Sequence, residues 1–317
     1  MREFRITKDD ADQRVDKFIQ KTMKTMPKSL MYKYIRNKKI KVNRKRCEIS
    51  QRLQEGDIMQ CYIPEEFFVR EQKENFKLVD STLDILYEDE NLLVVNKPSG
   101  LLAHSDTSAV QDNLADRILH YLYDKGVYDP DAAQSFTPAL CHRIDRNTQG
   151  IVLAAKNAMT LRFINEKIRE REIEKQYLCI VEGSMEHKAE ELVLYHQKQE
   201  GNKVEIRKDA VSGYQEIRTR YRCLHAGVHH SLVEVDLLTG KSHQIRAVMA
   251  YLHHPLYGDV KYGAHKNQRK DFQALCAYRL TFALRDVPEE FAYLQGKCFE
   301  LKENAVKTLY DTLEKRS

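Results

Sequence analysis

The densest group of potentially reactive side chains lies at residues 141–150, which read Cys-His-Arg-Ile-Asp-Arg-Asn-Thr-Gln-Gly. The apolar segment 151–155 follows directly, so the group is expected on a loop that enters a buried strand, where side chains are held rigidly. Asp145 could act there as a nucleophile, or form a structural ion pair with a neighbouring arginine. A protein kinase loop is excluded, because the sequence has no glycine-rich phosphate loop and no Asp-Phe-Gly segment.

A second polar group occupies residues 238–246, which read Leu-Thr-Gly-Lys-Ser-His-Gln-Ile-Arg. Ile245, Val248, Met249 and Leu252 follow at helical spacing, so a helix is predicted to begin within this group. Its first amides and the guanidinium of Arg246 could bind a phosphate or a carboxylate. A capped helix with an exposed arginine remains the alternative.

Two smaller groups lie nearby in the sequence. Tyr177 opens the apolar strand 177–181, where a tyrosine is usually half-buried packing. Residues 255–263, Pro-Leu-Tyr-Gly-Asp-Val-Lys-Tyr-Gly, are expected to form a tight loop. Histidines 243, 253 and 254 lack metal-binding spacing, so no metal site is predicted.

These four groups, in this order and together with Val-Asn-Lys-Pro-Ser-Gly-Leu at 95–101, closely resemble the RluA family of pseudouridine synthases over about residues 83–285. The resemblance implies that Asp145 is the catalytic carboxylate, with Tyr177 and Arg246 as further catalytic residues and no cofactor. It also implies RNA contacts by six other side chains: His142, Arg143, Thr148, Lys241, His243 and Gln244.

Five positions depart from the common family spelling: Ile144 for Leu, Gln149 for Ser, Lys241-Ser242 for Arg-Thr, and Val248 where His is frequent. None removes a proposed catalytic group. Lys241 keeps the positive charge but cannot form the bidentate contact of a guanidinium. These departures are expected to affect substrate preference.

The implied reaction breaks the bond from ribose to a uracil nitrogen, turns the base, and rejoins it through a ring carbon. A carboxylate can attack either the sugar or the base, and the sequence leaves both routes open. Arg246 is expected to keep Asp145 ionised and oriented, and Tyr177 to stack on the uracil and help remove the ring-carbon proton. Because the target must leave its stack, Arg143 is a candidate to fill the vacated space.

Positive charge is concentrated at the start of the chain. Residues 1–64 contain 17 Lys and Arg against 8 Asp and Glu, a net charge of +9, whereas the rest contains 35 against 39, a net charge of −4. A basic module favours a polyanionic partner, although a solvated basic face is the alternative. Helical spacing is present over 12–26, Ser29 is a plausible cap for a second helix, and 40–42 and 58–63 are predicted strands.

This order of elements resembles the alpha-L type RNA-binding domain over roughly residues 12–64. The resemblance implies RNA contacts by cationic side chains on the second helix and the turns that follow it: Lys28, Lys33, Arg36, Lys38, Lys39, Arg44 and Lys45.

The predicted organisation is a small α/β RNA-binding domain at 1–64, a linker without regular elements at 65–82, and a catalytic domain at 83–317. Strands and helices of the body do not alternate regularly. We therefore expect an α+β fold with a mixed, largely antiparallel sheet flanked by helices.

The remaining expectations concern the location, oligomeric state, partner and alternative functions of the protein. The seven cysteines lack a C-x-x-C pair, and no apolar run is long enough to span a membrane, so a cytoplasmic monomer is expected. A non-catalytic ribosome-assembly factor and a nucleoside hydrolase stay as alternatives, although a hydrolase would need a second carboxylate to activate water. Structured RNA is the expected partner, and residues 27–43 look closest to the C type of large-subunit ribosomal RNA synthase.

Overall fold

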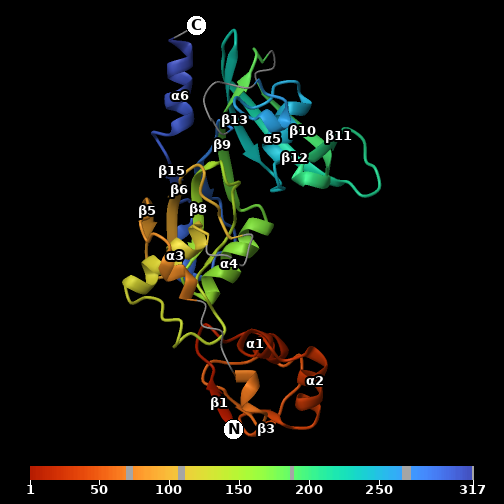
Figure 1. Cartoon of the computed structure of the whole chain (residues 1–317), viewed down its shortest axis with the longest axis vertical. Helices are drawn as coiled ribbons and strands as arrows, with labels where there is room; N and C mark the ends of the chain where they lie inside the picture. Colours follow the sequence, from red (N-terminus) through yellow and green to blue (C-terminus); the bar gives the residue numbers. More distant parts are fainter. Residues whose placement is uncertain (69–73, 106–110, 186–188, 266–272, 316–317) are drawn as a thin grey trace.

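The computed structural model describes residues 1–68, 74–105, 111–185, 189–265 and 273–315. In these ranges the chain forms a four-stranded and an eleven-stranded sheet. Figure 1 shows the small sheet and its two helices at one end of the molecule, and the large sheet with its helices at the other. The α+β fold predicted from the sequence is confirmed.

The N-terminal unit contains a mixed set of short elements: β1 (Arg2–Arg5), α1 (Val15–Thr22), α2 (Lys28–Arg36), β2 (Ile40–Val42), β3 (Lys45–Arg46) and β4 (Ile58–Cys61). The strands lie in the antiparallel order β1-β4-β2-β3. Its core is an apolar cluster in which Phe18 and Ile19 of α1 meet Met31 of α2 and Met59 of β4. This unit therefore has a hydrophobic core that is separate from the core of the large sheet.

The turn between β2 and β3 has only two residues, Asn43 and Arg44, both with positive φ (51° and 64°). This is the geometry of a two-residue hairpin turn matched to the twist of the strands. The Asn43 side chain fixes the turn by donating to Asp57 (2.7 Å) and accepting from the Ile58 amide (2.9 Å). Arg44 is therefore displayed at the exposed tip of the hairpin.

Between the two units, the expected linker contains two short 3-10 helices, η1 (Glu65–Phe68) and η2 (Glu74–Leu78), and residues 69–73 lie outside the described ranges. Phe67 and Phe68 join the N-terminal core. Phe76 packs against Tyr123 of the body, with ring centroids 5.9 Å apart. The prediction that this stretch carries no regular element is wrong, because it contains these two short helices. Its aromatic residues pack on the N-terminal unit at one end and on the body at the other.

The body is built on one large sheet, with the order β11-β10-β12-β13-β9-β14-β8-β6-β5, β15 beside β14 and β7 beside β8. Among the strand pairings of the described residues, β8 with β14 is the parallel one and the others are antiparallel. The strands are β5 (Ile85–Glu88), β6 (Leu92–Lys97), β7 (Ala139–Leu140), β8 (Gln149–Ala155), β9 (Ile173–Glu182), β10 (Ala189–Lys198), β11 (Val204–Arg207), β12 (Gln215–Ala226), β13 (His230–Leu237), β14 (Leu275–Phe282) and β15 (Cys298–Glu300).

Helices cover both faces of this sheet, so its central strands are apolar on both sides. On one face α4 and α6 pack on Leu178 and Ile180 of β9, and on the other α3 and α5 pack on Cys179 and Val181. The helical elements of the body are α3 (Leu114–Asp124), α4 (Ala158–Arg169), η3 (Glu200–Asn202), α5 (Gln244–Tyr251), η4 (Val260–Tyr262), η5 (Glu289–Leu294) and α6 (Ala305–Glu314). None of the described helices is long and apolar enough to cross a membrane.

The predicted elements of the body are largely confirmed, including the hairpin of β5 and β6, and α3 with Asn113 as its N-cap. In the N-terminal unit two predictions need correction. The first helix spans only Val15–Thr22, and the second begins at Lys28, so Ser29 is inside its first turn rather than capping it. Pro27 stands in the capping position with an extended backbone, and its ring already fixes φ near the helical value.

The two units meet through carboxylates of the loop after β1. Asp10 is buried and accepts hydrogen bonds from the Ser135 hydroxyl (2.6 Å) and the Gln134 amide (3.0 Å) of the body. Asp9 accepts from the Ala158 amide (2.8 Å) at the N-terminus of α4, where a negative charge is stabilised by the helix dipole. These contacts join the basic unit to the body by hydrogen bonds that do not involve the linker.

Gly150 allows β8 and β14 to approach closely. Its φ is 138°, and a β-carbon there would lie 2.6 Å from the backbone nitrogen of Ala277 and against the carbonyl oxygen of the same residue. Only glycine fits this conformation and this contact. Gly150 is the second residue of β8, directly after the loop that carries Asp145. Its pairing with Ala277 therefore places the end of that loop next to β14.

Replacing Gly150 with Ala should lower the free energy of unfolding by about 2 kcal/mol or more, since it combines backbone strain with a clash. Urea unfolding of the full chain measures this. Gly126→Ala is the matched control, because Gly126 also has a positive φ (67°) but has open space around it. Equal losses in the two variants would show that close packing at position 150 is unimportant.

Candidate active site

The body contains a cavity of about 890 Å³, which we call the larger cavity. Its walls come from the 142–148 loop, the start of β9, the end of β13 and the turn that leads into α5. Asp145, Tyr177 and Arg246 all line it. Asp145 and Arg246 also line a smaller cavity of about 440 Å³, so the carboxylate lies where the two hollows meet.

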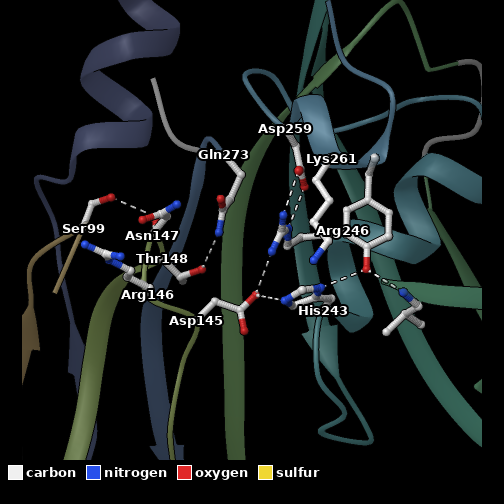
Figure 2. Close-up of polar contacts among 12 residues, drawn as sticks. Ser99, Asp145, Arg146, Asn147, Thr148, His243, Arg246, Asp259, Lys261 and Gln273 are labelled. Carbon is white, nitrogen blue, oxygen red and sulfur yellow. Dashed lines mark hydrogen bonds and ion pairs between the residues drawn. The ribbon is translucent and has the colours of Figure 1, made fainter. Parts of the chain in front are cut away.

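A chain of ion pairs holds Asp145. The guanidinium of Arg246 binds Asp259 through two nitrogens, at 2.7 and 2.8 Å, and a third nitrogen lies 3.4 Å from Oδ2 of Asp145 (Figure 2). The Asp259 side chain is 2% exposed, whereas that of Asp145 is 29% exposed. The buried bidentate pair fixes the direction of the guanidinium, and the looser contact leaves Asp145 accessible from the cavity.

His243 lies near the same carboxylate oxygen of Asp145 as Arg246 (Figure 2). Its Nε2 lies 3.9 Å from Oδ2 of Asp145, and its Nδ1 lies 2.9 Å from the hydroxyl of Tyr262. That hydroxyl already accepts the Val204 amide proton (3.0 Å), so it can donate its own proton to Nδ1 and leave the proton of the neutral ring on Nε2, facing Asp145. Burial lowers the pKa of His243, opposed by the charge of Asp145. His243 has φ 55°, which turns its ring toward the cavity ahead of α5.

Lys97 forms hydrogen bonds that support the loop carrying Asp145. This side chain is fully buried, and its ammonium donates to the carbonyl oxygens of Pro98 (2.9 Å), Leu101 (2.8 Å) and Arg146 (2.9 Å). Burial lowers the pKa of Lys97 to about 8, with the charge of Asp145 acting in the opposite direction. The bond to Arg146 joins the end of β6 to the residue next to Asp145.

Tyr177 is buried beside Asp145 on the face of β9 that α3 and α5 cover. Burial raises the pKa of Tyr177, and the charge of Asp145 adds to the effect. The phenol therefore holds its proton tightly. This favours the ring as an apolar surface over the hydroxyl as a proton acceptor.

The sequence profile described as RNA pseudouridylate synthase matches residues 91–251, which contain Asp145, Tyr177 and Arg246. The chain belongs to this family. The synthase is thus an isomerase that converts uridine to pseudouridine in RNA, and the resemblance found in the sequence is confirmed.

Relatives extend over most of the chain. An uncharacterized RNA pseudouridine synthase of Mycoplasma capricolum is 31% identical over 301 residues, covering 94% of this chain and 96% of the relative. The ribosomal large subunit pseudouridine synthase C of Escherichia coli K12 is 31% identical over 84% of this chain and 81% of its own length. The fold of the synthase is similar to that of human RNA pseudouridylate synthase domain containing 1, with a TM-score of 0.52, 21% identity, and coverage of 74% and 95%.

Three side chains that the sequence suggested as RNA contacts also form hydrogen bonds within the protein. Thr148 is buried and accepts from Gln273 (3.4 Å), and Gln244 is buried and bonds both Thr239 (3.0 Å) and Thr219 (2.9 Å). His142 accepts the Leu153 amide proton (3.2 Å), and burial lowers its pKa to about 3, so the ring is neutral. All three residues line the larger cavity, and their RNA contacts stay a prediction.

Other predicted contacts remain open to solvent. Arg143 and Lys241 are exposed and line the larger cavity, and Arg143 makes no hydrogen bond or ion pair with any described residue. The seven predicted cations of the N-terminal unit are all exposed, and none forms an ion pair within the described ranges: Lys28, Lys33, Arg36, Lys38, Lys39, Arg44 and Lys45.

Sequence reasoning missed two residues of the site of the synthase. Asp259 was expected to lie in an ordinary tight loop, and Lys97 was noticed only as part of a family string. An acidic residue in a glycine-bounded turn and a lysine at the end of an apolar strand are the available signals, but neither shows its partner. In the described part of the chain no group of three or more His, Cys, Asp or Glu residues is arranged to hold a metal ion.

Replacing Asp259 with Asn should lower kcat of the synthase by roughly 10- to 100-fold with a smaller change in KM, because Arg246 would lose its bidentate anchor and Asp145 its orientation. Steady-state kinetics on an RNA substrate measures this. Asp311→Asn, at an exposed position on α6, is the control. An unchanged kcat in Asp259→Asn would disprove the anchoring role.

Replacing Lys97 with Met should remove a specific pH dependence of stability. The pKa of Lys97 is lowered from 10.5 to about 8 on folding, so the unfolded chain binds this proton more tightly and stability rises with pH over that interval. The Met variant should lack this rise, and should also lose about 2 kcal/mol or more because three carbonyl groups lose their donor. Urea unfolding at pH 7.5 and pH 9.5 tests both expectations. The same pH slope in both proteins would contradict the assignment.

Proposed function

We propose that this synthase isomerises specific uridines of large-subunit ribosomal RNA, with Asp145 as the catalytic carboxylate. The observation that carries the proposal is the arrangement at Asp145: an accessible carboxylate, oriented by a buried Arg246–Asp259 pair, at the junction of two cavities. A carboxylate held in this way can attack a sugar or a base without further conformational change.

The other cavity residues have supporting roles in this proposal. Tyr177 offers a flat apolar ring on which the extruded uracil stacks. Arg143 stands exposed beside Asp145 with no partner among the described residues, so it is free to enter the RNA and fill the space that the uridine leaves. The contacts of these residues offset the cost of unstacking, roughly a few kcal/mol.

Ribosomal RNA as the target is supported by the relatives and by charge. Synthases C of Escherichia coli and Vibrio cholerae, which are 31% and 32% identical to this chain, are named for the ribosomal large subunit. The N-terminal unit presents seven exposed cations that form no ion pair with a described residue, which suits a structured polyanion. We therefore propose residues 1–64 as the RNA-binding domain and 83–317 as the catalytic domain of a C-type enzyme, which works where ribosomes are assembled, in the cytoplasm.

Replacing Asp145 with Asn should reduce turnover by roughly a thousandfold or more while leaving RNA affinity nearly unchanged, because the amide keeps the shape but loses the nucleophile. Pseudouridines would be mapped in ribosomal RNA from cells that lack the gene and are complemented with wild-type protein, Asp145→Asn or Asp311→Asn. We expect the large-subunit sites to return with the wild-type protein and the Asp311 variant alone.

Two results would overturn the proposal. Restoration by Asp145→Asn would remove the catalytic role of this residue. Loss of the gene without any change in large-subunit pseudouridines would remove the proposed target. A non-catalytic assembly factor would show ribosome defects that Asp145→Asn repairs.

A further inference from the structure

Lys175 is a cation of the larger cavity to which neither the sequence analysis nor the proposed mechanism assigns a role. It lies on β9 two residues before Tyr177, so both side chains leave the strand on the same face. Both line the larger cavity, as does the 238–242 turn on the opposite wall. The Lys175 Nζ would lie 3.9 Å from a β-carbon built on Gly240, so the ammonium reaches across from β9 to that turn.

The ammonium of Lys175 has no polar partner among the described residues. The side chain is half-buried, and it forms no hydrogen bond or ion pair with any residue that the structure describes. Burial lowers the pKa of Lys175, and its charge in turn helps to lower the pKa of the neighbouring His142. Holding a charge away from water without a counterion costs free energy. Such a group is retained when a ligand supplies the missing charge.

Two other cations of the cavity wall have an acidic partner. Arg246 binds Asp259 and Asp145, and Arg220 donates to Glu191 (2.8 Å). Glu174, next to Lys175 in the chain, leaves β9 on the opposite face, and so does Gln176, which is paired with Asp236 of β13. Lys175 forms no ion pair with a described residue, in contrast to Arg220.

The chemistry of the missing ligand follows from the donor. An ammonium offers three donors and no acceptor, and it binds most strongly to an oxygen that carries negative charge. The uracil and the ribose of a bound nucleotide are neutral, whereas each link of the RNA backbone carries one negative charge. Arg171, exposed at the cavity rim in a left-handed conformation (φ 63°) and likewise without a partner among the described residues, extends the cationic path outward from Lys175.

We propose that Lys175 binds the backbone phosphate adjacent to the extruded uridine, and so fixes the strand while the base occupies the cavity beside Asp145 and Tyr177. The inference rests on the proposed function, since it takes RNA as the occupant of this cavity. It adds a phosphate subsite inside the catalytic domain, separate from the cations of the N-terminal unit.

The test compares six pairings, of two proteins with three RNAs. The proteins are the Asp145→Asn chain and the same chain with Lys175→Met, so that turnover does not disturb the binding measurement. The RNAs are a ribosomal stem–loop that the wild-type enzyme converts, and the same stem–loop with one uncharged methylphosphonate at the 5′ or the 3′ side of the target uridine. The riboses next to that link carry 2′-O-methyl groups in all RNAs.

We expect Lys175→Met to weaken binding of the charged RNA by about tenfold, the size of a charge-assisted contact. It should also reduce the slope of log affinity against log salt by about 0.7 to 0.9, the amount for one phosphate. One of the two methylphosphonates should weaken binding of the RNA to the Asp145→Asn chain by the same factor as Lys175→Met does. In the chain that also carries Lys175→Met, the same methylphosphonate should cause no further loss of affinity. This non-additivity identifies the phosphate.

Controls separate binding from folding. Lys302→Met removes an exposed lysine outside both cavities, and it should change neither affinity nor salt slope. Lys175→Met should unfold at the same or a higher urea concentration than its parent, because an uncompensated charge is removed. A less stable Lys175→Met chain would indicate a structural lysine and overturn the proposal.

The binding data can also contradict the proposal directly. An unchanged salt slope, or a methylphosphonate penalty that persists in Lys175→Met at both positions, would show that Lys175 does not meet a flanking phosphate. If no ribosomal stem–loop is converted by the wild-type enzyme, the proposed target fails instead. Any other RNA that the enzyme converts then serves for the same six pairings.

Discussion

The site depends on one interaction, the bidentate pair between Arg246 and Asp259. Both side chains are almost fully buried, and a buried charge is tolerated only with a partner in good geometry. Two nitrogens of the guanidinium are committed to Asp259, so the third points in a fixed direction toward Asp145. The reactive carboxylate can therefore stay partly exposed and loosely held without losing its orientation.

The rest of the large sheet keeps the loop of Asp145 at the right distance from that guanidinium. Gly150 lets the end of this loop lie against β14, and Lys97 binds its backbone from beneath. Both contacts are made by groups that cannot be exchanged for a similar residue, since one needs the absence of a β-carbon and the other needs three donors on one long side chain. The loop is thus rigid although its side chains face a cavity, which suits a site that must be preorganised.

Positive charge is used in two different ways along the molecule. The cations of the N-terminal unit are exposed, and in the proposed function they supply affinity that depends on salt and not on sequence. Lys175 and Arg171 line the larger cavity, where the proposed contact would also determine which part of the strand enters. The carboxylates Asp9 and Asp10 bind the basic unit to the body, so the proposed RNA contacts of the two regions would lie at a defined spacing.

The sequence by itself determined the family, the α+β fold and the basic N-terminal unit, and it proposed Asp145, Tyr177 and Arg246 as site residues, because apolar periodicity and ordered motifs are local properties of the chain. It also predicted α5 and the hairpin of β5 and β6, whose signals lie within a few residues. It did not show that Thr148 and Gln244 form hydrogen bonds within the protein, since a polar side chain next to a motif looks the same whatever it contacts. Only the tertiary structure decided that Asp259 anchors Arg246, that Lys97 binds the loop from 49 residues away, and that Lys175 has no polar partner among the described residues. Those properties arise when distant segments pack together, and burial then determines which charges need a counterion.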